Sequence, residues 1–126
     1  MLTKAKISLR VPDAGSSKKY FSLQINQELS NEPCQFQMPT KLLAVSDIEG
    51  NFKAFRRLLL RNRVIDRRYQ WTFGDGHLVI IGDCFDRGHQ VVECLWLIYS
   101  LEHKARKRGG YVHFILGNHE IMNMNG

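Results

Sequence analysis

Residues 77–88 read HLVIIGDCFDRG, an apolar run that ends at once in a loop of glycine, carboxylate and arginine residues. A short apolar run followed by such a loop is typical of a buried strand in a parallel sheet. Two further apolar runs end in the same way: LLAVS at residues 42–46 precedes DIEG, and YVHFIL at residues 111–116 precedes GNHE. The sequence therefore predicts three strands that each end in polar side chains.

Helical periodicity separates these three runs. Phe52, Phe55 and Leu58 predict a helix that ends near Asn62, and apolar residues spaced three and four apart predict a second helix from Val91, basic before Gly109 and Gly110. The fold class is therefore α/β. Right-handed crossovers would make the strands parallel neighbours, and ligands bind beyond the carboxyl ends of such strands.

Two finer features of this sheet are also predicted. The run LLAVS is short and wholly apolar until its final serine, which suits a strand buried on both faces. The runs YQWTF and HLVII flank Gly74-Asp75-Gly76, a glycine-rich turn that favours a hairpin between residues 69–73 and residues 77–81.

The first forty residues form a separate unit in this interpretation. Residues 4–11, KAKISLRV, and residues 20–25, YFSLQI, alternate like short strands on either side of a turn-forming segment. We predict an N-terminal extension over residues 1–40 that adds strands or covers a sheet edge, and a second unit over residues 41–126.

The composition is that of one soluble globular domain. The chain has 126 residues, 44% of them hydrophobic and 24% charged, with no membrane-spanning run and no apolar core of a signal peptide at its start. A cytoplasmic protein without a membrane partner is expected. Cys34, Cys84 and Cys94 have no CxxC spacing, so they are interpreted as reduced thiols, with Cys84 a packing residue.

The formal net charge of +6 comes largely from two basic clusters at the predicted helix ends, residues 56–68 and residues 104–108. Such clusters can attract nucleic acid, but basic side chains also favour the last turn of a helix because of its macrodipole. The helix-end explanation is preferred, and nucleic acid is retained only as the less favoured partner.

Oxygen donors occur in all three polar loops. The carboxylates of Asp47, Glu49 and Asp83 and the side-chain amide of Asn118 are ligands that divalent cations accept. Asp83 leaves the middle of the three runs and could bridge two ions in a two-metal site. The histidines at positions 77, 103 and 113 are interpreted as structural or surface residues, and His89 is interpreted as a residue near the start of the second helix.

The residues GDCFDRG at 82–88 and GNHE at 117–120 match the GDxxDRG and GNHE motifs of calcineurin-like metallophosphoesterases. The form is most similar to the branch with the serine/threonine phosphoprotein phosphatases and the diadenosine tetraphosphate hydrolases. The resemblance covers residues 41–120. It implies the N-terminal half of a β-sandwich flanked by helices, with residues 1–40 outside it.

The resemblance also implies roles for individual residues. Asp47 would bind a first metal ion, Asp83 would bridge two ions and Asn118 would bind the second. His119, oriented by Asp86, would act at the leaving-group oxygen, and Arg87 would bind the substrate phosphate. All of these residues would belong to one active site. Glu120 is given no chemical role, and a helix-capping role suits it.

The chain departs from the family pattern in two respects. Glu49 stands where the family has histidine, and a carboxylate there shifts the preference among Mn, Fe, Zn and Mg toward Mn or Fe. Family members also supply metal-binding histidines from a second half, whereas this chain ends six residues after Glu120. A truncated, nearly inactive portion of a longer protein is expected, or two copies that cover each other's exposed sheet.

Two functions follow as hypotheses. The first is hydrolysis of a phosphate ester by the full-length protein with two divalent metal ions that activate water, on a phosphorylated protein, nucleotide or small phosphoester. The second is a noncatalytic module that binds phosphate groups or nucleic acid on the same fold, and Glu49 is the residue that favours it.

Overall fold

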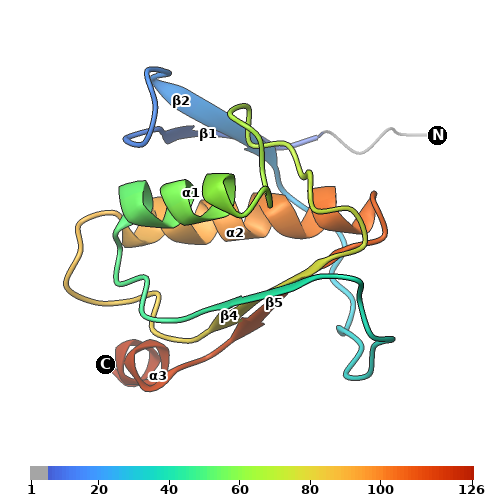
Figure 1. Cartoon of the computed structure of the whole chain (residues 1–126). Helices are drawn as coiled ribbons and strands as arrows, with labels where there is room; N and C mark the ends of the chain where they lie inside the picture. The colour runs from blue at the N-terminus through green and yellow to red at the C-terminus, as the bar shows by residue number, and fades with distance from the viewer. Residues whose placement is uncertain (1–5) are drawn as a thin grey trace.

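The computed structural model describes residues 6–126 as three layers, with helices between a parallel sheet and an antiparallel hairpin (Figure 1). The elements in chain order are β1 (Ser8–Pro12), β2 (Tyr20–Gln24), β3 (Leu42–Val45), α1 (Phe52–Arg61), β4 (His77–Ile81), α2 (Val91–Arg106), β5 (Tyr111–Ile115) and α3 (Asn118–Asn125). The α/β fold class predicted from the sequence is confirmed.

The parallel sheet has the strand order β3-β4-β5. Leu42 aligns with His77 across the first pair, and His77 aligns with Tyr111 across the second. All three strands therefore point the same way, as the crossover rule predicts, and their carboxyl ends lie along one edge of the sheet. This arrangement brings the three polar loops together.

Helices α1 and α2 lie on one face of this sheet (Figure 1). The side chain of Asn51 caps α1 by accepting a hydrogen bond from the Ala54 backbone N–H at 3.1 Å, and α1 then buries Phe52, Phe55 and Leu59. Its C-cap is Asn62, which confirms the predicted end of the helix. Helix α2 likewise buries one apolar side, as its periodicity predicts.

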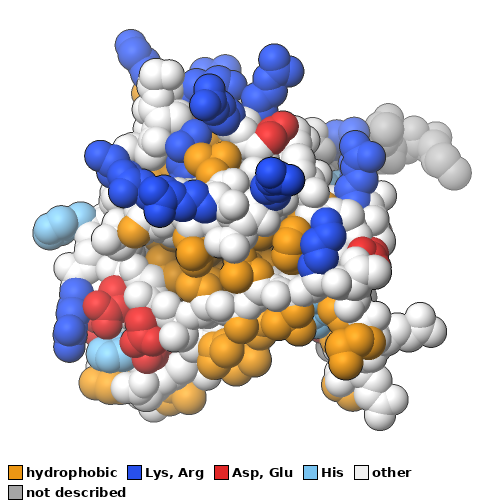
Figure 2. Space-filling model, viewed as in Figure 1, with side chains coloured by type: hydrophobic (Ala, Val, Ile, Leu, Met, Phe, Trp, Pro, Cys, Tyr) orange, Lys and Arg blue, Asp and Glu red, His pale blue; other side chains and the backbone are white. Residues whose placement is uncertain are grey.

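The β1–β2 hairpin covers the opposite side of the helices, and most Lys and Arg side chains visible in Figure 2 lie over these two layers. Phe21 of β2 stacks on Phe52 of α1 with ring centroids 5.9 Å apart, and the Asn26 N–H donates to the Tyr99 hydroxyl at 2.6 Å. The predicted N-terminal strands are confirmed, except that residues 4 and 5 of that prediction lie outside the described residues. The helices thus form the middle layer.

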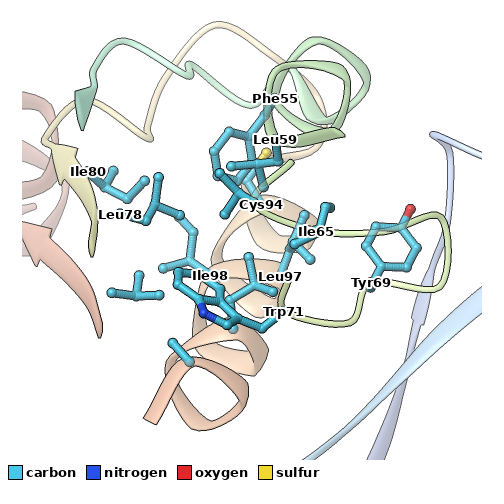
Figure 3. Packing of buried hydrophobic residues seen from close by; sticks show 14 of the residues in the cluster. Phe55, Leu59, Ile65, Tyr69, Trp71, Leu78, Ile80, Cys94, Leu97 and Ile98 are labelled. Carbon is cyan, nitrogen blue, oxygen red and sulfur yellow. The ribbon is translucent and has the colours of Figure 1, made fainter. Parts of the chain in front are cut away.

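The core lies between the helices and the parallel sheet (Figure 3) and continues to Val11, Phe21 and Leu23 of the hairpin on the other side of the helices. Leu78 and Ile80 of β4 and Leu97 of α2 are fully buried, and burial of each such side chain is worth about 1.5–3 kcal/mol. Cys84 and Cys94 are also fully buried among these residues. The predicted packing role of Cys84 is therefore confirmed.

The predicted hairpin between residues 69–73 and residues 77–81 is wrong. Residues 69–73 form a turn-rich connection in which Trp71 makes only an isolated antiparallel bridge to Ile65, and its indole N–H donates to the Gly74 carbonyl at 2.8 Å. The reason is that β4 is the central strand. Its two edges pair with β3 and β5, so neither edge is free for residues 69–73.

The prediction that LLAVS is buried on both faces is also wrong. β3 is an edge strand, and the Leu42 side chain is 59% exposed. Ile81 and Ile115 are exposed on the same sheet, and within residues 6–126 no layer covers its outer face. None of the helices in residues 6–126 has the length and apolar character needed to span a membrane.

Candidate active site

The first and second polar loops are joined through their backbones at the carboxyl ends of β3 and β4. The N–H groups of Glu49 and Gly50 donate to the carbonyls of Asp83 and Cys84 at 3.1 and 3.0 Å, respectively. The Gly88 N–H returns a bond to the Glu49 carbonyl at 2.8 Å. These bonds fix the positions of the carboxylate-bearing residues independently of their side chains.

Two glycine contacts explain why this junction is so close. A Cβ on Gly88 would lie 2.1 Å from the Glu49 carbonyl oxygen, which is far inside van der Waals contact. A Cβ on Gly82 would lie 2.5 Å from the Gly117 Cα, and Gly82 also has a φ of +66°. Only glycine permits the second loop to contact both of its neighbours.

Backbone strain is concentrated in these loops. Asp47, Glu49, Asp83 and Arg87 have φ values of 54°, 48°, 55° and 66°, and they make up four of the six non-glycine residues with positive φ in residues 6–126. Such conformations cost on the order of 1–3 kcal/mol each and persist where the surrounding structure enforces them. Their coincidence with the predicted site residues supports a functional role for this edge of the sheet.

Glu120 makes more contacts than the capping role predicted from the sequence requires. Its carboxylate is buried and accepts hydrogen bonds from the backbone N–H groups of Asp83, Cys84 and Phe85 at 2.8, 2.6 and 3.0 Å. It also accepts from the Gly117 N–H at 2.8 Å, which is the capping contact expected at the start of α3. Glu120 therefore ties the third loop to the second.

The backbone hydrogen bonds to Glu120 favour its ionised form. Burial by itself would raise the pKa of this carboxyl, but the four backbone donors stabilise the anion and hold its pKa below the usual value for glutamate. The signal for this role was present in the GNHE motif, but a capping contact alone does not reveal that the same carboxylate also binds the second loop.

The predicted pair of His119 and Asp86 is brought together. The His119 Nδ1 atom lies 3.3 Å from the Asp86 Oδ2 atom, and the His119 backbone N–H donates to the Asp83 Oδ1 atom at 3.3 Å. Helix α3 begins at Asn118, so Asn118 and His119 lie in its first turn rather than in the loop predicted from the sequence.

A pocket of about 890 Å³ lies between α1 and the first two polar loops. The charged residues on its wall are Asp47, Glu49 and Arg87, and His89 also lines it. His89 precedes Gln90, the N-cap of α2, and so lies just before the helix. The other predicted site residues do not line this pocket: Asp83, Asp86, Asn118 and His119.

The side chains of Asp47, Glu49, Asp83 and Asn118 carry carboxylate and amide oxygens, which divalent cations accept as ligands. All four residues follow strands at the same edge of the sheet. Within residues 6–126, however, no three side chains of histidine, cysteine, aspartate or glutamate are grouped closely enough to hold a metal ion. The assignment of Asp47, Glu49, Asp83 and Asn118 as metal ligands therefore stays a prediction.

His77 and His113 lie away from the carboxyl end of the sheet. His77 begins β4 and His113 lies in the middle of β5, and the His77 Nδ1 and His113 Nε2 atoms are 3.0 Å apart. Burial and the neighbouring His77 lower the pKa of His113. The Phe36 ring packs edge-on against both, with centroids 5.6 and 4.6 Å away. This packing agrees with the structural role predicted for them.

The sequence matches the calcineurin-like phosphoesterase family over residues 40–126. Shewanella-like protein phosphatase 2 of Arabidopsis thaliana is 34% identical over 92 residues, which are 73% of this chain and 24% of the relative. An uncharacterized protein of Schizosaccharomyces pombe is 35% identical over 98 residues, 76% of this chain and 30% of the relative. Shewanella-like protein phosphatase 1 of Plasmodium berghei is 31% identical over 86 residues.

Solved structures extend the similarity to the N-terminal hairpin. A mutant cold-active protein tyrosine phosphatase gives a TM-score of 0.66 at 32% identity and covers 98% of this chain and 42% of that chain. The cold-active enzyme of a psychrophilic Shewanella species gives 0.62, also at 32% identity, and covers 94% of this chain and 41% of that chain. Coverage of 98% takes in β1 and β2, which precede the family match.

The chain spans less than a third of the length of the curated relatives and about two fifths of the solved chains. The matched part contains the parallel sheet, the three polar loops and both motifs. On this evidence, the chain belongs to the calcineurin-like phosphoesterase family.

Proposed function

We propose that this chain supplies the phosphate-handling half of a metal-dependent phosphatase that acts on phosphorylated proteins. The observation that carries the proposal is the contact between His119 and Asp86, at the same end of the sheet as Asp47, Glu49 and Asp83, whose backbones have positive φ angles. A histidine–carboxylate pair at the same end of the sheet as three further carboxylate-bearing residues suits phosphate-ester hydrolysis better than it suits a structural role.

Two divalent ions, with Mn²⁺ or Fe favoured over Zn²⁺ and Mg²⁺, would be held by Asp47, Glu49, Asp83 and Asn118. When bound, such ions polarise phosphate oxygens and lower the pKa of water. Glu49 gives this set more carboxylate character than the histidine usual in the family, which is the reason for preferring Mn²⁺ or Fe.

The protein's own groups would perform the remaining steps. Asp86 lies 3.3 Å from the Nδ1 atom of His119 and would orient the ring, which leaves Nε2 free to donate a proton to the departing oxygen. Arg87 is exposed beside the pocket, and its planar guanidinium can pair with two phosphate oxygens at once. Glu120 positions these groups through the backbone rather than by contact with substrate.

The substrate class is inferred from the relatives. Two of them carry the name protein phosphatase and the solved enzymes the name protein tyrosine phosphatase. A phosphorylated side chain on a protein is therefore the first candidate, ahead of a nucleotide or a small phosphoester. Arg87 is exposed where it lines the pocket, which agrees with a macromolecular substrate.

The test joins residues 1–126 to the C-terminal part of the Arabidopsis relative and measures release of phosphate from phosphotyrosine and phosphoserine peptides with added Mn²⁺. We expect hydrolysis by the chimera and almost none by the 126-residue chain. Asp83→Asn, Arg87→Ala and His119→Asn in the chimera should each lower kcat/KM by about a hundredfold or more.

The matched control is His103→Asn, which changes an exposed histidine on α2 and should leave the rate unchanged. Calorimetric titration with Mn²⁺ gives a second readout, in which Asp83→Asn should weaken binding. A chimera that hydrolyses peptides equally well with Asp83→Asn and His119→Asn would overturn the proposal.

Glu49 also favours a second candidate, a noncatalytic module that binds phosphate-bearing ligands on the same loops. In that case the chain would bind oligonucleotides or phosphopeptides in a salt-dependent manner, and Asp83→Asn would not weaken the binding. Binding that disappears on removal of Mn²⁺, together with hydrolysis by the chimera, would contradict this candidate.

A further inference from the structure

A second hollow lies away from the candidate active site, between β2 and the carboxyl end of α2. It has a volume of about 380 Å³ and is lined by residues 22–24 of β2, by Gln70 and Trp71, and by the last turns of α2. We call it the β2 groove. Its polar walls and its position on the edge of a strand distinguish it from the apolar hollows of the molecule.

The backbone of β2 has a free edge at this groove. The bonds from the Ile25 N–H to the Ile7 carbonyl and from the Asp13 N–H to the Lys19 carbonyl, both about 3 Å, set the alternation of the antiparallel ladder. Residues 21 and 23 then direct their backbone groups toward β1, whereas Ser22 and Gln24 direct theirs away from it.

No other strand in residues 6–126 pairs with β2 on that side, and no backbone hydrogen bond there uses Ser22 or Gln24. Both residues line the β2 groove. An unpaired strand edge of this kind offers N–H and C=O groups that an extended segment can pair with.

The wall opposite this edge is basic. His103, Lys107 and Arg108 are exposed at the end of α2, and within residues 6–126 neither Lys107 nor Arg108 forms an ion pair. Lys104 is half-buried between them, with its ammonium group donating to the Tyr69 carbonyl at 2.7 Å. The groove therefore combines the free edge of β2 with the positive charges of Lys107 and Arg108, which no acidic side chain in the described part of the chain neutralises.

The neighbouring Arg106 differs from Lys107 and Arg108 because it forms an ion pair. Its guanidinium pairs with Glu32, which also accepts a hydrogen bond from the Tyr111 hydroxyl at 2.9 Å. One side of the α2 terminus is thus neutralised by the chain itself. The side that faces the β2 groove is not.

We propose that the β2 groove binds an extended acidic peptide segment, which adds to the free edge of β2 as a third strand and pairs its carboxylates with Lys107 and Arg108. Phe21 and Leu23 point from β2 into the helix layer, so every second side chain of an added strand would also point toward α2. Acidic residues at alternate positions would meet the basic wall. The proposal does not depend on phosphatase activity.

The test measures fluorescence anisotropy of a labelled peptide in which glutamate alternates with threonine. We expect binding at low salt, and a loss of about tenfold or more in affinity for the double variant Lys107→Glu, Arg108→Glu. Both side chains are exposed, so the fold should persist, and circular dichroism verifies this. Arg57→Glu with Arg61→Glu, on exposed positions of α1, is the matched control and should leave the affinity unchanged.

Two altered peptides test the mode of binding. A peptide with glutamine in place of glutamate should bind at least about tenfold more weakly, because the charge pairs are lost. A peptide N-methylated at the amides that would face β2 should also lose binding, because the strand hydrogen bonds cannot form. Amide chemical shifts of Ser22 and Gln24 should respond most strongly to the unmodified peptide.

Three results would overturn the proposal. Equal binding of the N-methylated peptide would show that no strand is added. Equal loss of affinity in the α1 control variant would show a nonspecific charge effect. A single-stranded oligonucleotide of matched charge that displaces the peptide at equal or lower concentration would identify a nucleic-acid surface instead.

Discussion

The two ends of the parallel sheet are built from the same three strands but are held together in different ways. At the carboxyl end, glycine contacts, positive φ angles and the buried carboxylate of Glu120 join three loops through their backbones. At the amino end, the rings of Phe36, His77, Tyr111 and His113 pack against one another, with centroids 4.6–5.9 Å apart.

The amino end of the sheet serves stability, whereas the carboxyl end is arranged for binding. Side-chain packing at the amino end stabilises the strands without unusual backbone conformations. The carboxyl end accepts strain that costs stability and places carboxylates, arginine and histidine side by side, as expected where open α/β sheets bind ligands. The following changes test whether backbone contacts really dominate one end and ring packing the other.

Glu120→Ala should have the largest effect. It leaves four backbone N–H groups without their acceptor, so we expect the free energy of unfolding in urea to fall by about 3 kcal/mol. Glu102→Ala is the matched control, because burial raises the pKa of the Glu102 carboxyl and its removal should cost little. Equal losses in the two variants would contradict the anchoring role.

Gly88→Ala should come next. Its new Cβ would lie 2.1 Å from the Glu49 carbonyl oxygen, so the first two loops must move apart, at a cost of about 2 kcal/mol. Gly74→Ala serves as the comparison, since Gly74 has a φ of +59° but open space around it, and the conformational penalty alone is about 1 kcal/mol. Thermal unfolding of both variants compares crowding with conformation.

Phe36→Ala tests the amino end. Its ring contacts His77, Tyr111 and His113, and loss of these contacts should lower stability by about 1 kcal/mol in urea unfolding. Met38→Ala, at a side chain that is 92% exposed in the same segment, should have almost no effect. If the two variants were equally stable, ring packing would not hold this end of the sheet.

The smallest effect is a pH dependence. The pKa of His113 is lowered in the folded chain, so the unfolded chain binds its proton more readily, and the free energy of unfolding should fall as the pH drops below about 6.5. His113→Gln should make this slope shallower. His103→Gln, at an exposed histidine, should leave it unchanged, and the reverse pattern would rule out His113 as the source.

Much of the fold could be predicted because its strands and helices carry distinct periodicities. The apolar runs and the three- and four-residue spacings of α1 and α2 located those elements and their parallel order. The hairpin predicted around the glycine turn at residues 74–76 is wrong, because a local turn pattern carries no information on which strand edges are already paired. Leu42 was expected to be buried because an apolar run does not distinguish a central strand from an edge strand.

The candidate site was predictable as a collection of loops but not as a geometry. Motif residues indicated that Asp86 and His119 belong together, and the structure places their side chains 3.3 Å apart. The interlocking of Gly88 with Glu49 depends on distances between segments far apart in the chain, which no local pattern contains. The same holds for Glu120, whose carboxylate serves residues that lie more than thirty positions earlier.

The order of the layers has a consequence for synthesis on the ribosome. The β1–β2 hairpin is complete at Gln24, whereas α2, on which it packs, ends about eighty residues later at Arg106. At roughly 5–20 residues per second, the hairpin is exposed for several seconds before that helix exists, and a lone two-stranded hairpin is marginally stable at best. The hairpin therefore reaches its packed position only after the later helices have been made, with Phe21 and Leu23 accessible to chaperones in the interval.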